Sequence, residues 1–213
     1  MNAAAAIRVE SATAEIQALA RLARGRDGGP MLLGHALCWI GRGVIGAAVR
    51  EAVRGRGTML EECHRIERSG PPVLAGREWD VEAAIAELEP GRIVVRTQAA
   101  SAMGEALLAE VHLLAIGQAK VPPRRPQART PGTVLREIVF TDADLEVYVA
   151  LSGDDNALHV DPDAAARAGL PRRAVHGALI AAALEDAVRD WAGPGTPGAL
   201  SARFLGVLLA GGR

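Results

Sequence analysis

The central part of the chain consists of short apolar runs separated by turn sequences. Residues 58–66, 77–88, 92–100 and 106–116 each read as a strand, and the sequences SGPP, EPG and SAMG stand between them. Short strands joined by turns rich in Gly and Pro are typical of an antiparallel meander. We therefore predict one antiparallel sheet in this part of the chain.

Two long helical stretches, residues 35–53 and 177–191, are strongly apolar. The GRG triplet at 41–43 lies inside the first stretch, where it gives no dinucleotide-binding fingerprint. The first two turns of the second stretch are apolar on all sides, which favours complete burial over a surface stripe. A buried helix combined with a meander predicts an α+β fold, with an antiparallel sheet wrapped around a central helix. Residues 199–211 read as a further strand.

Capping signals mark two shorter helices in the second half of the chain. Thr141 and Asp144 form a capping-box-like start. Asp161, placed directly before a proline, predicts the start of an Ala-rich helix that Gly169 ends. Asp161 and Asp163 are better explained as charges at a helix start than as metal ligands.

The chain divides around residues 118–135, a segment with four prolines and three arginines that reads as an extended linker. The parts on either side resemble each other weakly. Residues 32–53 align with residues 174–191, and further short similarities follow in the same order. We therefore predict a duplication, with one repeat at 1–117 and the other at 136–213.

The composition limits the class of protein. Hydrophobic residues make up 49% of the chain, enough for a buried core, whereas aromatics make up 3%, so packing depends on Ala, Leu, Val and Ile. A net charge of −1 with interspersed signs argues against a nucleic-acid surface. Neither a signal peptide nor a membrane-length apolar run is evident, and two cysteines fit a reducing compartment. We expect a cytoplasmic protein that does not enter a membrane.

The candidate chemistry lies in the sequence SGDDNALH at residues 152–159. Asp154 stands five positions before His159 in a polar, irregular segment, and His176-Gly177 opens the apolar helix beyond it. A carboxylate, an imidazole and a backbone donor are the groups needed to add water to, or remove it from, an activated double bond. The alternative is an aspartate that caps a turn and a solvated histidine.

These residues resemble the pattern of the MaoC-like (R)-specific enoyl-CoA hydratase family of the hot-dog fold. That pattern runs roughly S/T-G-D-x-N-P-L-H-x-D, followed by an Ala-rich helix and then HG. The resemblance covers about residues 138–211 and combines both motifs with the capped helix between them. It implies a degenerate first hot-dog repeat and an incomplete second one, to be completed by a homodimer or a complementary subunit unless the chain is a truncation.

The resemblance also implies an activity. Asp154 and His159 would hold one water and exchange its proton with the substrate, while the Gly177 amide would stabilise the enolate-like thioester oxygen. The reaction would hydrate trans-2-enoyl thioesters of coenzyme A or acyl carrier protein to the (R)-3-hydroxyacyl form, or run in reverse. It would need no metal or redox cofactor, because the thioester supplies the activation.

Four further residues are candidates for the substrate side of the site: Ser152, Asn156, His176 and Glu185. Asn156 would shape the loop, and His176 would hold the segment before the central helix. Glu185 stands nine residues after His176, where family members can carry a serine, so it could alter substrate choice or perturb the pKa values of Asp154 and His159. Ala157 replaces the proline of the family pattern.

Two other functions stay open. The chain could be a non-catalytic thioester-binding or scaffolding subunit that needs a partner chain, or a hot-dog thioesterase. The sequence EECH at residues 61–64 also resembles a cluster of metal ligands. Side chains on a strand alternate between its faces, however, and no second ligand pair stands at useful spacing, which argues against zinc there.

Overall fold

The computed structural model of the protein describes residues 2–24, 30–117, 134–193 and 197–212. Its strands are β1 (Asn2–Glu10), β2 (Thr58–Ser69), β3 (Glu78–Glu89), β4 (Arg92–Ser101), β5 (Ala106–Gly117) and β6 (Ala199–Arg203). Its helices are α1 (Thr13–Leu22), the 3-10 helix η1 (Leu33–Trp39), α2 (Gly43–Val53), α3 (Asp142–Ser152), α4 (Ala157–Val160), α5 (Pro162–Arg167) and α6 (Gly177–Ala192). All four strands predicted between residues 58 and 116 are therefore confirmed.

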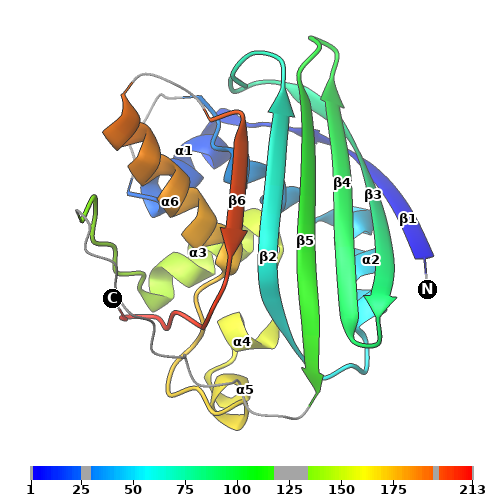
Figure 1. Ribbon diagram of the computed structural model, residues 1–213, viewed down its shortest axis with the longest axis vertical. Helices are drawn as coiled ribbons and strands as arrows, with labels where there is room; N and C mark the ends of the chain where they lie inside the picture. The colour runs from blue at the N-terminus through cyan, green and yellow to red at the C-terminus, as the bar shows by residue number, and fades with distance from the viewer. Residues whose placement is uncertain (1, 25–29, 118–133, 194–196, 213) are drawn as a thin grey trace.

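The described strands form one antiparallel sheet in the order β1-β3-β4-β5-β2-β6 (Figure 1). The sequence did not predict β1, which pairs with β3 from Asn2↔Ala86 to Glu10↔Glu78. Its first half is mainly alanine, a residue that is depleted in strands. Pairing with β3 supplies the stability that the local sequence does not.

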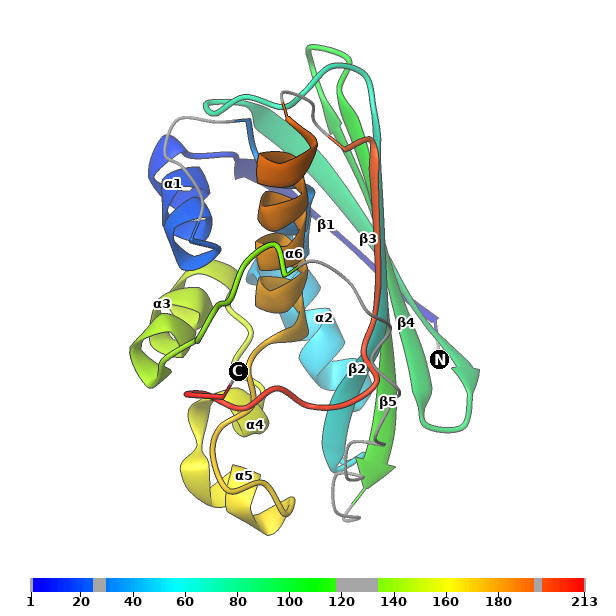
Figure 2. The same cartoon turned by 60° about the vertical axis from the view of Figure 1, so that its left-hand side comes forward.

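The helices lie on one face of the sheet, with α2 and α6 packed against it (Figure 2). The first turns of α6 are buried on nearly all sides, because Leu179, Ala181 and Ala182 have no exposed surface. Beside them, Trp39 packs on Trp79 with ring centroids 5.5 Å apart, and both rings are fully buried. The α+β class and the buried central helix agree with the prediction.

The predicted helix at residues 35–53 is in fact broken. The 3-10 helix η1 ends at Trp39, and α2 begins only at Gly43. Between them, Gly41 lies so close to the backbone of Ser152 and Gly153 that an added methyl group would collide with both. The side chain of Arg42 donates from Nε to the Leu151 carbonyl at 2.9 Å, at the end of α3. The break therefore joins the first half of the chain to the loop that follows α3.

The predicted strand at residues 199–211 is also shorter than expected. β6 ends at Arg203, and the chain then leaves the sheet. The segment beyond it runs along residues 173–175, where the Val175 amide donates to the Leu208 carbonyl at 2.8 Å. A continuous apolar run does not reveal where the chain leaves the sheet, because apolar side chains suit both a longer strand and a segment packed along residues 173–175.

Both halves of the chain contribute to the sheet. β6, from the second half, pairs with β2 from Cys63↔Arg203 to Glu67↔Ala199. The duplication and the boundaries of the two repeats remain predictions, and the predicted linker lies, except for residues 134–135, outside the described residues. In the described ranges, we find no helix with the length and apolar character needed to cross a bilayer.

Candidate active site

The loop that carries Asp154 begins where α3 ends. The predicted capping box starts this helix: the Asp144 amide donates to Thr141 Oγ1 at 3.2 Å, and the Thr141 amide donates to the Asp144 carboxylate at 2.7 Å. At the other end, Gly153 has a φ of 69°, a left-handed conformation that favours glycine. This turn directs the chain away from the helix axis and exposes Asp154 to the site.

Ser152 holds the turn together from inside the protein. Its buried hydroxyl donates to the Tyr148 carbonyl at 2.8 Å and accepts from the Asp154 amide at 3.1 Å. Both bonds remain within the loop and its helix. Ser152 therefore shapes the backbone around Asp154.

Asn156 ties the same loop to the sheet. Its side-chain oxygen accepts from the Leu158 amide at 3.2 Å and so caps α4, while its Nδ2 donates to the Met59 carbonyl on β2 at 3.3 Å. An asparagine can do both because it carries a donor and an acceptor. The absence of the family's proline at Ala157 leaves these bonds intact.

His159 has a defined tautomer. Its ring is 6% exposed, and Nδ1 lies 2.9 Å from the Ala174 carbonyl oxygen. Because a carbonyl oxygen can only accept, Nδ1 carries the proton, and Nε2 is left as the basic nitrogen. The imidazole is thus oriented as a general base requires.

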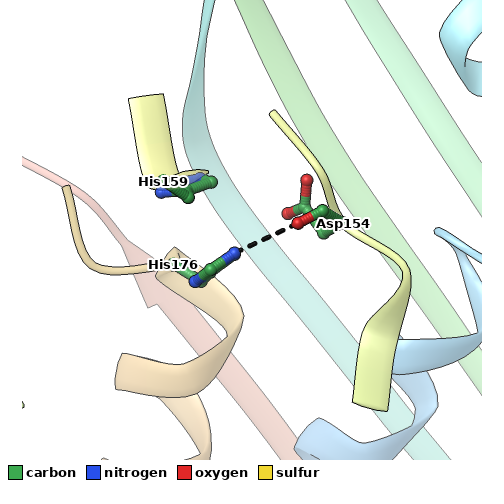
Figure 3. A group of neighbouring side chains, drawn as sticks. All are labelled: Asp154, His159 and His176. Atoms are coloured by element: carbon green, nitrogen blue, oxygen red, sulfur yellow. Dashed lines mark hydrogen bonds between the residues drawn. The ribbon is translucent and has the colours of Figure 1, made fainter. Parts of the chain in front are cut away.

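Asp154, His159 and His176 converge from three different elements: the loop after α3, the short helix α4 and the residue before α6 (Figure 3). One potential ligand atom from each lies within 4.8 Å of the others, so the three could also hold a metal ion. The two imidazoles stack with centroids 3.9 Å apart. The His176 ring donates from Nε2 to the Asp154 carbonyl at 3.3 Å, which holds the loop against α6.

Burial sets the protonation of this group. It raises the pKa of Asp154; the nearby His159 opposes this rise and the charge of Glu61 adds to it. Burial, reinforced by His159, lowers the pKa of His176 to about 3, so that ring is neutral near pH 7. His176 is therefore suited to holding the loop, and Asp154 and His159 are the groups suited to proton transfer.

The amino end of α6 supplies backbone donors. His176 is the N-cap but makes no side-chain hydrogen bond to the helix, so the amides of the first turn have no intrahelical partner. A methyl group on Gly177 would collide with Oε2 of Glu61 and with the ring of Phe204. Glu61 and Phe204 thus leave no room for a side chain at this position, and the helix dipole favours negative charge there.

Glu61 and His64 belong to the EECH segment, where strict alternation along a strand would place their side chains on opposite faces. The structure contradicts that assumption. The pairing of β2 with β5 is irregular between Glu61 and Cys63, and the extra residue shifts the alternation. Glu61 and His64 consequently face the same side, with Oε1 and Nε2 3.4 Å apart. Local sequence does not mark such a bulge, because it depends on the partner strand.

Glu185 lies elsewhere. Its carboxylate is buried and accepts from the Leu33 amide at 2.9 Å and from the Gly34 amide at 3.1 Å. It does not line either of the two cavities described below. The structure therefore gives Glu185 an anchoring position at the start of η1, away from both cavities.

Two cavities meet at the site. The larger, of about 720 Å³, is lined by apolar side chains of α2, β4 and β5 together with Asp154. The smaller, of about 260 Å³, is lined by His159, Gly177 and Phe204 among others. Asp154 lines the larger cavity and His159 lines the smaller one, so the pair stands where the two cavities meet.

Comparison with known proteins agrees with the motif. Residues 118–213 match the family model of the MaoC like domain, as the resemblance predicted. Two curated relatives align over short segments. The mitochondrial 3-hydroxyacyl-(acyl-carrier-protein) dehydratase of Arabidopsis thaliana is 48% identical over 50 residues, which is 23% of this chain. The 3-hydroxyacyl-thioester dehydratase X of Mycobacterium tuberculosis is 39% identical over 69 residues, which is 32% of this chain. These segments span 30% and 24% of the relatives' own lengths.

Solved structures share the fold over nearly the whole chain. The crystal structure of HtdX from Mycobacterium tuberculosis superposes with a TM-score of 0.71 at 20% identity, covering 97% of this chain and 84% of that one. A MaoC-like dehydratase from Phytophthora capsici gives 0.70 at 16% identity, covering 99% and 82%. The chain therefore has the hot-dog fold of MaoC-like dehydratases.

Proposed function

We propose that this protein is a hydro-lyase that interconverts trans-2-enoyl and (R)-3-hydroxyacyl thioesters. The observation that carries the proposal is the convergence of Asp154 and His159 at the amino end of α6, between an apolar cavity and a second, smaller one. The dehydratase names of its relatives support the same reaction class. The family resemblance adds the (R) configuration and a carrier, either coenzyme A or acyl carrier protein.

Asp154 and His159 act on one water in this proposal. As the water oxygen attacks the β-carbon, the pair removes a proton from the water, and the electrons of the double bond move onto the thioester oxygen. The pair then returns one proton to the α-carbon, so it ends with the protons with which it began. Dehydration is the same path in reverse.

The amides at the start of α6 stabilise the negative thioester oxygen that forms between these steps. Gly177 permits close approach, and the helix dipole has the required sign. Since the thioester itself activates the double bond, the mechanism uses no metal or redox cofactor.

Hydration of crotonyl-CoA by the purified protein tests the proposal most directly. We expect loss of the absorbance of the conjugated enoyl thioester, with 3-hydroxybutyryl-CoA as the product. A product of the (S) configuration would contradict the stereochemical part. Release of free thiol without hydration would instead indicate a thioesterase.

The pH profile should report Asp154. The carboxylate must be ionised to accept a proton, and burial raises its pKa above the ordinary value of 3.8. As the pH falls through that raised pKa, the ionised form is lost, so kcat/KM should decline at a pH clearly above 3.8. The measurement is kcat/KM against pH, with circular dichroism at each pH to confirm the fold. Full activity down to pH 3.8 in the folded protein would contradict this role.

A non-catalytic subunit that needs a partner is the second candidate. Leu184, Val188 and Trp191 stand on one face of α6 and are 53%, 43% and 71% exposed, which favours a partner on that face. A homodimer or a complementary hot-dog subunit would cover it. Sedimentation of the purified chain, combined with the crotonyl-CoA assay, separates the candidates: activity that appears only with a second subunit supports this one.

A further inference from the structure

Glu61 stands at the junction of the two cavities. Four residues line both of them: Met59, Glu61, Asn156 and Leu158. Glu61 is the ionisable member of this set. A molecule that extends from the smaller cavity into the larger one therefore comes close to its side chain.

The contacts of Glu61 hold its carboxylate against the start of α6. Oε1 lies 3.4 Å from Nε2 of His64, whose side chain is completely buried, while Oε2 lies against Gly177. The His64 ring nitrogens make no hydrogen bond within the described part of the chain, which leaves this ion-pair contact as their polar interaction. Burial pushes the pKa of Glu61 upward, but the contact with His64 lowers it overall. The carboxylate is therefore ionised near neutral pH.

An ionised carboxylate at this position conflicts with the proposed chemistry. The amides of the first turn of α6 are the donors for a thioester oxygen that becomes negative, and a second negative charge beside them raises the energy of that state. Glu61 also occupies space next to Gly177, where a methyl group already finds no room. A thioester oxygen held at these amides would therefore compete with the Glu61 carboxylate for the same space.

We propose that Glu61 is a gate between the two cavities, whose side chain leaves the amino end of α6 when an acyl thioester binds. The inference rests on the proposed function, because it assumes a thioester oxygen at Gly177. Glu61 then determines how readily an acyl chain enters the apolar cavity. Moving an ionised side chain away from His64 lowers the observed affinity for the thioester.

Titration calorimetry with octanoyl-CoA tests the gate, because this saturated thioester can bind but cannot be hydrated. We expect Glu61→Ala to lower the Kd by about tenfold or more, since neither charge nor bulk then has to be displaced. Glu61→Gln retains the bulk and removes the charge, so its Kd should fall between those of Glu61→Ala and the wild type. Because Gln has nearly the size of Glu, the Glu61→Gln variant still tests the gate if Glu61→Ala does not fold.

Glu67→Gln is the matched control. Glu67 is on the same strand and its carboxylate contacts Arg65, but it is exposed and lines neither cavity. Its Kd should equal that of the wild type. Equal or weaker binding by both Glu61 variants overturns the gate.

The two proposals fail in different ways. Tight octanoyl-CoA binding by a protein that never hydrates crotonyl-CoA would refute the hydro-lyase, while the comparison of Glu61 variants would still decide the gate. Hydration of crotonyl-CoA with no gain in affinity on removing the Glu61 charge would refute the gate and keep the hydro-lyase. Absence of octanoyl-CoA binding in the wild type and all variants would overturn the gate.

Discussion

Replacing Asp154 with Asn should lower the turnover of enoyl-thioester hydration by about 10²–10⁴-fold, the usual contribution of a general acid–base group. The amide has nearly the size of the carboxylate and can still accept from the Asn156 amide, as Asp154 Oδ1 does at 3.2 Å. It cannot take a proton from water. Steady-state kinetics with crotonyl-CoA measure the loss, and circular dichroism shows whether the fold is retained.

Removal of the imidazole should act on the same step. His159→Ala deletes the base whose tautomer the Ala174 carbonyl sets, and we expect a loss of similar size. The two substitutions together should cost little more than either alone, because the residues act as a unit. Fully additive losses would show that they work in separate steps.

Matched controls separate chemistry from general damage. Asp163→Asn changes an exposed carboxylate in the first turn of α5, and His112→Ala removes a half-buried histidine that pairs with Glu110 on β5. Neither residue lines the two cavities. Both controls should retain near-normal turnover. Near-normal turnover of Asp154→Asn or His159→Ala would refute the assignment of the pair.

Trp39→Ala should give the largest loss of stability. The Trp39 ring is completely buried at the end of η1, packs on Trp79 at 5.5 Å and meets the His35 ring edge-on at 5.9 Å. Truncation leaves a cavity that rigid neighbours cannot fill, at a cost of about 3–5 kcal/mol. That is a large share of the roughly 5–15 kcal/mol by which a domain is stable.

Urea denaturation followed by circular dichroism measures this effect. Met103→Ala is the control, since Met103 is 65% exposed in the turn between β4 and β5 and its truncation should change the free energy of unfolding by less than about 0.5 kcal/mol. A similar loss for both variants would show that burial at Trp39 is not the source of stability.

Features decided by neighbouring residues were predictable. The capping box at Thr141 and the Asp161 N-cap follow from local hydrogen bonding, and both are present in the structure. The start of α6 at Gly177 follows from the apolar run that begins there. The motif from Ser152 to His159 likewise identified the loop, because its capping bonds reach only two to four residues along the chain.

Features decided by contacts between distant segments were not predictable. The break at Gly41 depends on the backbone of Ser152 and Gly153, and the position of Glu185 depends on the unpaired amides at the start of η1. The residues that contact Gly41 and Glu185 are known only once the two halves of the chain are packed together.

The sequence by itself determined the α+β class, the central helix and the loop that presents Asp154 and His159, since these depend on periodicity and short-range capping. Tertiary structure alone decided that the two side chains meet at the start of α6 and that Glu61 stands beside them. The physical reason for the position of Glu61 is the bulge in β2: one extra residue reverses the alternation of the strand and brings Glu61 to the face that carries His64. Pairing with β5 creates that irregularity, and a single strand read alone does not contain it.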